Sequence, residues 1–274
     1  MQHTSSDTLS ENSIKLLQIT DTHLFASDEG SLLSVKTLQS FQAVVEQVMA
    51  RHVEFDYLLA TGDISQDHSA ASYQRFADGI APLEKACFWL PGNHDYKPNM
   101  SSVLPSPQIT TPEQVELNAH WQLILLDSQV VGVPHGRLSD QQLSMLEHHL
   151  QASPEKNTLI LLHHHPLLVG SAWLDQHTLK DAEAFWQIVE RFPMVKGIVC
   201  GHVHQDMNVM HKGIRVMATP STCVQFKPQS DDFALDTVSP GWRELTLHAN
   251  GEITTQVQRL ASGSFLPDFT SSGY

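Results

Sequence analysis

The sequence predicts a single α/β domain in which two β-sheets are covered by helices. Apolar, strand-like runs alternate with segments of helical period from residue 14 to residue 200. From Met207 onward, all the predicted elements are strands. With 274 residues, of which 41% are hydrophobic and 17% charged, the chain can bury one sizeable core. We therefore expect one domain over residues 13–260, preceded by a flexible segment at 1–12 and followed by a C-terminal tail at 261–274.

The first half of the alternation begins with an apolar run at residues 14–19, which predicts a strand. A helix should follow, because apolar residues recur there at steps of three and four: Leu38, Phe41, Val45, Val48 and Met49. A strand at 57–60, a helix at 69–80 and a strand at 87–90 continue the pattern. The stretch 97–112 is rich in Pro and Ser, and we expect an inserted loop.

The second half repeats the alternation, starting with a strand at 121–126. Ser139 and Gln142 have the spacing of a capping box, which predicts a helix that ends near Leu150. A strand, a helix and a strand should follow at 159–162, 179–192 and 195–200. Near the end of the chain, Asn250-Gly251 separates two alternating runs and predicts a hairpin of strands at 243–248 and 252–258.

The composition excludes several classes of partner. Asp and Glu number 30 against 16 Lys and Arg, so the formal net charge of −14 argues against binding to nucleic acid or an anionic membrane. No apolar run approaches the roughly 18 residues of a membrane span, and the N-terminus lacks the features of a secretory signal. The three cysteines are widely spaced and odd in number, which suits reduced thiols and a cytoplasmic location. Histidine is abundant, with 17 copies.

Polar residues that can bind metal follow five of the expected strands: Asp21-Thr22-His23, Gly62-Asp63, Gly92-Asn93-His94-Asp95, His163-His164-His165-Pro166 and Gly201-His202-Val203-His204. Taken alone, the first two clusters are more simply a cap and a turn, and the third is equally well a turn with a surface histidine. Together they lie at the carboxyl ends of strands, the edge at which open α/β sheets bind ligands. Carboxylate, amide and imidazole groups without thiolates suit two borderline divalent ions such as Fe, Mn or Zn.

The order D-x-H, G-D, G-N-H-D, H-H-P and G-H-x-H resembles the signature of the calcineurin-like metallophosphoesterases. The longer stretches LQITDTHLF, LLDSQVVGVPHG, LLHHHPL, ATPSTCVQFKP and SPGWREL are similar to the bacterial class III 3',5'-cyclic AMP phosphodiesterases. The resemblance implies a four-layer α-β-β-α sandwich of two mixed sheets flanked by helices.

The resemblance also implies a role for each site residue. The first metal would be held by Asp21, His23 and His204, and the second by Asn93, His164 and His202. Asp63 would bridge the two ions and take part in catalysis, and His94 would be a catalytic acid that binds no metal. Substrate would contact five of these residues: His23, Asp63, Asn93, His94 and His204.

Three assignments stay open. The triple histidine leaves His163 as an alternative to His164, with His165 expected to support the ligands from behind. Asp95 either orients the His94 imidazole or caps the following turn. Residues 131–136 and 219–227 are candidate walls for the base and ribose, although ordinary strand packing explains them equally well.

The function that the resemblance implies is hydrolysis of cyclic AMP to 5'-AMP, which would lower this second messenger. Two metal ions would activate a hydroxide for attack on phosphorus. Iron is expected by resemblance, and the ligand types also accept Mn, Zn or Co. The alternatives are a broader phosphoesterase acting on other diesters or monoesters, and a metal-binding regulator without turnover.

Overall fold

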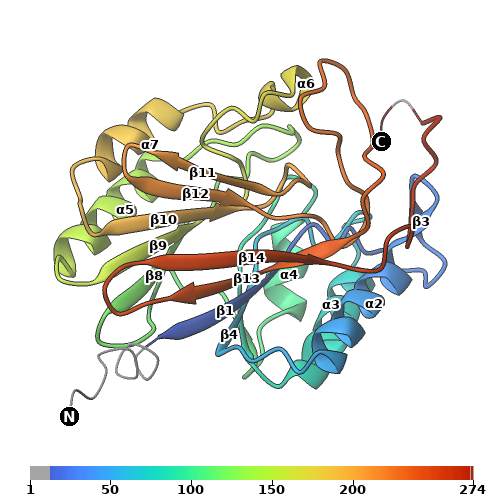
Figure 1. Ribbon diagram of the computed structural model, residues 1–274, viewed down its shortest axis with the longest axis horizontal. Helices are drawn as coiled ribbons and strands as arrows, with labels where there is room; N and C mark the ends of the chain where they lie inside the picture. The colour runs from blue at the N-terminus through green and yellow to red at the C-terminus, as the bar shows by residue number, and fades with distance from the viewer. Residues whose placement is uncertain (1–12, 272, 274) are drawn as a thin grey trace, which may run out of the picture.

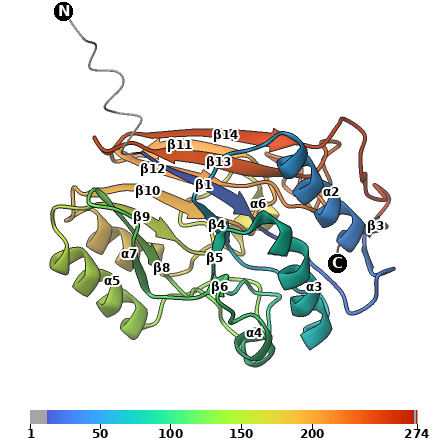
Figure 2. The same cartoon turned by 90° about the horizontal axis from the view of Figure 1, so that it is seen from below.

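The computed structural model describes residues 13–271 and 273. The expected flexible segment at 1–12 lies outside these residues. Two six-stranded sheets and one two-stranded sheet make up the β-structure of the described chain. Figures 1 and 2 show the two large sheets packed against each other, with helices on their outer sides. Within the described residues, no helix has the length and apolar character needed to cross a membrane.

The first large sheet has the strand order β14-β13-β1-β4-β5-β6. Its strands are β1 (Ile14–Ile19), β4 (Tyr57–Ala60), β5 (Ala86–Trp89), β6 (Ile109–Thr110), β13 (Gly241–Leu247) and β14 (Ile253–Arg259). The pairs from β1 to β6 are parallel, whereas β13 and β14 pair antiparallel as the expected C-terminal hairpin. The sheet is therefore mixed.

The second large sheet has the order β11-β12-β10-β9-β8-β7. Its strands are β7 (Gln114–Glu116), β8 (Trp121–Leu125), β9 (Asn157–Leu161), β10 (Val195–Cys200), β11 (Met207–His211) and β12 (Ile214–Ala218). The four central strands are parallel, and the two edge strands are antiparallel to their neighbours. A separate small sheet pairs β2 (Ser31–Leu32) with β3 (Val35–Lys36).

The helices cover the outer faces of both sheets. They are α2 (Thr37–Ala50), α3 (Ala70–Ile80), η1 (Ala81–Leu83), α4 (Lys97–Val103), α5 (Asp140–Ala152), α6 (Ala172–Asp175) and α7 (Ala182–Val189). Phe41 of α2 and Phe76 of α3 share a core cluster with the first sheet, and Leu146 of α5 and Phe185 of α7 share one with the second. A third cluster lies between the sheets. Four layers result. Figure 2 shows α2 and α3 on one side of the molecule and α5 and α7 on the other.

The expected inserted loop at 97–112 is partly regular structure, so that prediction was wrong in part. Helix α4 occupies its first residues, and β6 adds an edge strand. Pro98 lies in the first turn of α4, where a missing N–H removes no helical hydrogen bond. Met100 is fully buried in the core, and this burial stabilises a short helix whose composition does not favour it.

Other expected boundaries also shift. The helix expected at 179–192 is reduced to α7. Beyond β12, residues 219–240 are irregular apart from one bridge between Phe226 and Leu235. In the tail, Phe265 packs against the core, and the amide of Asp268 donates to Leu33 O at 2.9 Å. This contact attaches the tail to the β2–β3 region.

Candidate metal centre

All five motifs lie where their strands end, at one common edge of the molecule. Asp21 and His23 follow β1, Asp63 follows β4, and Asn93 and His94 follow β5. The histidines at 163–165 follow β9, and His202 and His204 follow β10. The site therefore draws on the parallel strands of both sheets.

The first cluster joins Asp21, His23 and His204, whose candidate ligand atoms lie within 4.8 Å of one another. Nδ1 of His204 is 2.8 Å from the carbonyl of Val224, and Nδ1 of His23 is 2.7 Å from Gln66 Oε1. Because both acceptors are oxygens, each Nδ1 donates in these bonds, and the Nε2 atoms of the two rings face each other. The two Nε2 atoms are 3.2 Å apart. Two imidazole nitrogens that face each other beside a carboxylate are suited to holding a cation.

Asp63 lies between the two clusters. Its Oδ2 is 3.8 Å from Nε2 of His23 and 3.3 Å from Nε2 of His163, and its Oδ1 accepts a bond from the amide of His94 at 2.8 Å. Burial raises the pKa of this carboxyl, but the surrounding histidines outweigh burial and hold it well below the ordinary value. Asp63 is therefore an ionised carboxylate that reaches both clusters.

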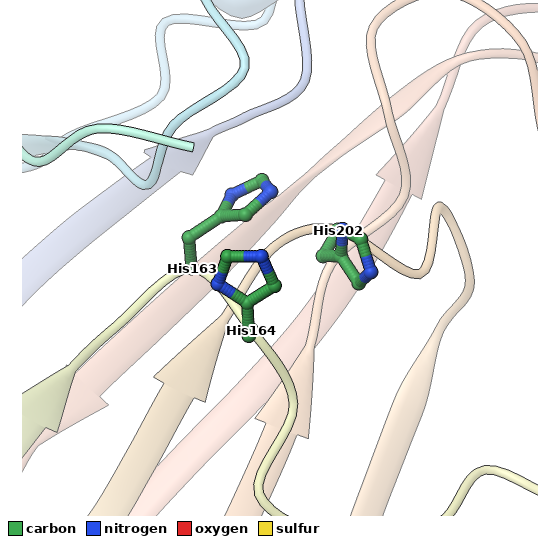
Figure 3. A group of neighbouring side chains, drawn as sticks. All are labelled: His163, His164 and His202. Carbon is green, nitrogen blue, oxygen red and sulfur yellow. The ribbon is translucent and has the colours of Figure 1, made fainter. Parts of the chain in front are cut away.

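The second cluster joins His163, His164 and His202 (Figure 3), whose candidate ligand atoms also lie within 4.8 Å of one another. Nε2 of His164 and Nε2 of His202 are buried without a hydrogen-bond partner within the described chain. Burial, followed by the neighbouring histidines, lowers the pKa of both residues well below the ordinary value. Both are therefore neutral imidazoles with unpaired nitrogens, the form that binds metal.

His163 and His164 differ in their surroundings. Nδ1 of His163 donates to the carbonyl of Thr61 at 2.7 Å, and its Nε2 is 3.2 Å from Asn93 Oδ1 and close to Asp63. Burial lowers the pKa of His163, but Asp63 outweighs it and raises the pKa to about 9. His164 instead places Nδ1 2.8 Å from Ser128 Oγ. The geometry thus brings His163, the alternative, next to Asp63 and Asn93.

Five of the candidate ligands hold an unusual backbone conformation. They have positive φ, the left-handed region that costs free energy for residues other than glycine: Asp21 (54°), His23 (45°), Asp63 (49°), His202 (69°) and His204 (49°). Backbone hydrogen bonds hold the turns, since the amides of Asp21 and His23 donate to Gly62 O and Asp63 O, each at 3.0 Å. Positive φ also occurs at other residues of the chain, and its recurrence at five neighbouring candidate ligands is typical of a functional site.

Two residues expected near the ligands have defined positions. The His165 ring stacks on His202 at 5.5 Å between centroids, and its Nε2 is 3.6 Å from Asp175 Oδ1. The His94 ring meets His23 edge-on at 5.0 Å and stays partly exposed. Burial lowers the pKa of His94 and outweighs the opposing effect of Asp63. His94 therefore lies beside the first cluster with access to a ligand.

The side chain of Asp95 supports the backbone of two turns. Its oxygens accept bonds from the amides of Gly92 at 2.9 Å and of Ile64 and Ser65 at 3.1 Å, and from Tyr73 Oη at 3.2 Å. Burial, with Asp63 second, raises the pKa of Asp95 to about 7. It ties the turn after β4 to the turn after β5, a role wider than either of the two expected ones.

A small cavity opens beside the second cluster. Its volume is about 150 Å³, and its lining includes Asn93, His94 and His202 together with the aromatic rings of Trp173, Phe226 and Phe233. Pro134 and Phe226 belong to the two expected walls, whereas Trp173, His177 and Phe233 were not expected. Gln66 and Ser128, which hydrogen-bond to Nδ1 of His23 and of His164, were also not expected, because no motif in the sequence marks them.

The chain matches known proteins along most of its length. Residues 14–206 match the profile described as calcineurin-like phosphoesterase. The chain is 99% identical over 274 residues, all of both chains, to "3',5'-cyclic adenosine monophosphate phosphodiesterase CpdA" from Vibrio vulnificus (strain CMCP6). It is 52% identical over 264 residues, 96% of both chains, to the protein of the same name from Escherichia coli (strain K12).

Solved structures share the fold at low sequence identity. A dimetal phosphatase from Danio rerio superimposes with a TM-score of 0.63 at 14% identity, covering 88% of this chain and 98% of that one. A purple acid phosphatase from yellow lupin gives a TM-score of 0.62 at 11% identity, covering 96% of this chain and 56% of that one. These likenesses confirm the predicted sandwich. With the profile match and the full-length relatives, they show that the chain belongs to the calcineurin-like phosphoesterase family.

Proposed function

We propose that this protein hydrolyses 3',5'-cyclic AMP to 5'-AMP at a centre of two divalent metal ions. The observation that carries the proposal is the pair of ligand clusters that share the buried carboxylate of Asp63. We infer the substrate from the names of relatives that align with nearly the whole chain.

We assign the ligand set on the basis of the distances. Asp21, His23 and His204 would hold one ion, Asn93, His163 and His202 the other, and Asp63 both. His163 takes the place expected for His164, because its Nε2 is the nitrogen that approaches Asn93 and Asp63. His164 remains the neighbour whose Nε2 is unpaired. Two ions held here would supply an activated nucleophile and polarise the phosphate, and iron is our first expectation for their identity.

The residues around the ions position the substrate and supply a proton. Attack at phosphorus forms one P–O bond and breaks the bond to the ribose 3'-oxygen, a poor leaving group as an alkoxide. His94, beside His23 and open to the cavity, is placed to give a proton to that oxygen. His23, Asp63, Asn93 and His204 complete the set that surrounds the phosphate.

An acidic protein can bind this anion because the charge is local. Two divalent ions bring about four positive charges, and Asp21 and Asp63 remove about two, so the centre stays positive. The formal net charge of −14 includes these two carboxylates, and the other charged residues of the chain sum to −12. We also propose a cytoplasmic location, where a second messenger would be degraded, since Cys87, Cys200 and Cys223 are buried free thiols.

The proposal is tested by assaying the metal-loaded protein against cyclic AMP, cyclic GMP, a 2',3'-cyclic nucleotide and a chromogenic diester, with bound metal quantified. We expect about two ions per chain and release of 5'-AMP from cyclic AMP. Turnover of the chromogenic diester without turnover of cyclic AMP would favour a broader phosphoesterase. Bound metal with no turnover of any substrate would favour a regulator.

A further inference from the structure

Three aromatic side chains form one wall of the cavity, which the candidate metal ligands Asn93 and His202 also line. Trp173 meets Phe226 edge-on at 4.9 Å and 81°, and meets Phe233 at 5.1 Å and 70°. These residues come from α6 and from the irregular connection between β12 and β13. An aromatic cluster that borders a strongly polar centre is suited to a ligand with one flat apolar part and one anionic part.

The wall is built into the fold. The amide of Lys227 donates to Ala234 O and the amide of Asp236 donates to Gln225 O, both at 2.8 Å, so residues 225–236 form a hairpin that carries Phe226 and Phe233. Asp175 at the end of α6 accepts bonds from Val169 N at 2.8 Å and Gly170 N at 3.0 Å. Since Asp175 also lies 3.6 Å from His165, α6 is held against the metal-binding edge.

The size of the cavity limits its occupant. About 150 Å³ is well below the roughly 300–1,000 Å³ of pockets for drug-sized ligands, so the cavity suits one ring system and not a whole nucleotide. A cyclic nucleotide whose phosphate contacts Asn93 and His94 carries its base a short distance away, on the same ribose. Trp173 lines this cavity, whereas its indole Nε1 is shielded from solvent, so the contact that Trp173 offers a base is its aromatic ring.

We propose that Trp173 and Phe233 form the subsite that binds the base of the cyclic nucleotide, with Trp173 as the principal contact. This inference rests on the proposed function for the identity of the substrate. It assigns binding of the base to α6 and the 225–236 hairpin, and binding of the phosphate to the strand-end residues. The base then increases affinity through stacking, without taking part in the chemistry at phosphorus.

Trp173→Leu and Phe233→Leu are the informative substitutions. Phe226 is unsuitable, because its ring stacks on the candidate ligand His204 at 4.2 Å and 9°, so its loss would also disturb the metal centre. Trp173→Phe keeps a ring and removes the N–H donor. Leu168→Ala is the matched control, because Leu168 is 73% exposed in the connection between β9 and α6 and does not line the cavity.

The test is calorimetric titration of the metal-loaded protein with 5'-AMP and, separately, with inorganic phosphate. Phosphate needs only the metal centre, whereas 5'-AMP also carries the base. We expect Trp173→Leu and Phe233→Leu each to raise the Kd of 5'-AMP by about tenfold, within the range of base stacking, and to leave the Kd of phosphate within about twofold. Trp173→Phe should lose less affinity for 5'-AMP than Trp173→Leu does. Leu168→Ala should bind both ligands as the wild type does.

Two results would overturn the subsite. One is an unchanged Kd of 5'-AMP in both leucine variants, and the other is an equal loss of 5'-AMP and phosphate, which would mean that these residues act through the metal centre. Turnover of cyclic AMP by the wild type is measured in parallel. If the wild type leaves cyclic AMP intact, the proposed function fails, while the two titrations still decide whether the aromatic wall binds a base.

Discussion

Nε2 of His163 lies 3.3 Å from Oδ2 of Asp63, and both side chains are almost completely buried. His163 Nδ1 is already bound to the carbonyl of Thr61, so only Nε2 faces the site. Unless a proton or a cation lies between them, the lone pair of Nε2 faces an anionic oxygen. The same nitrogen approaches Asn93 Oδ1, which makes His163 the histidine best placed to share an ion with Asp63.

The two neighbouring histidines can be separated by metal analysis. We expect His163→Ala to bind fewer than two ions per chain, because it removes the nitrogen nearest to Asn93 and Asp63. His164→Ala should retain more metal, since the contact that it loses is with Ser128. Metal content after dialysis, measured by mass spectrometry, checks both variants. Full occupancy in His163→Ala with metal loss in His164→Ala would reverse the assignment.

His94 is expected to affect turnover without affecting metal content. His94→Ala should lower kcat by about 10² to 10⁴, the usual contribution of a positioned proton donor. Metal should stay bound, because the His94 backbone, which supports Asp63 through its amide, is unchanged. His120→Ala, in the turn before β8, is the control and should match wild type. If His94→Ala lost as much metal as Asp63→Ala, the residue would be a ligand and not an acid.

Gly92 is expected to be irreplaceable because Asp63 lies too close to leave room for a side chain there. A Cβ there would lie 2.2 Å from Asp63 Oδ1 and 2.4 Å from the Asp63 amide nitrogen, and backbone cannot yield cheaply. Gly92→Ala should therefore lose metal and activity together. Gly213→Ala is the matched control: it sits in open space at φ +82°, so it should lower the free energy of unfolding by about 1 kcal/mol and leave metal content unchanged.

Metal content and thermal unfolding measured on both glycine variants separate local from general damage. A Gly92→Ala protein with two ions per chain and normal kcat would show that the turn after β5 adapts more easily than these distances allow.

The meeting of the candidate ligands at one edge was predictable because their signals share one geometric rule. Asp21, Asp63 and His202 each follow an apolar strand, and the carboxyl ends of parallel strands meet at one edge whatever the details of packing. The sequence could not show whether His163 or His164 approaches Asp63, because that depends on which ring turns toward it. Such orientation is set by partners such as Thr61 O, which are far away in sequence.

The roles of two other residues could not be predicted from the sequence, for the same reason. Asp95 was recognised as a candidate, yet its contacts with the amides of Ile64 and Ser65 arise only after β4 and β5 pair. Trp173 lies in a four-residue helix that is too short to show a helical period. The core strands and long helices were predictable because their burial imposes a regular pattern, which short elements beside the site lack.

Asp67 gives a prediction about pH and stability. Its oxygens accept bonds from the amide of Ala26 at 2.7 Å and from Ser69 Oγ at 2.7 Å, and they link the loop after β1 to the start of α3. Burial raises the pKa of Asp67, but these bonds outweigh burial and lower it below 3.8. Because the folded state favours the carboxylate, this stabilisation is present above the unfolded pKa and is lost as the pH falls through the folded pKa.

Asp67→Asn removes this titration and keeps a side chain of similar shape. We expect the wild type to exceed the variant in free energy of unfolding at neutral pH, and the difference to shrink as the pH falls below about 4. Urea unfolding at a series of pH values measures the difference. The effect should be modest, because the carboxyl is largely solvent-exposed and therefore screened. A difference that stays constant into acid would mean that the Asp67 contacts stabilise the loop through shape and not through charge.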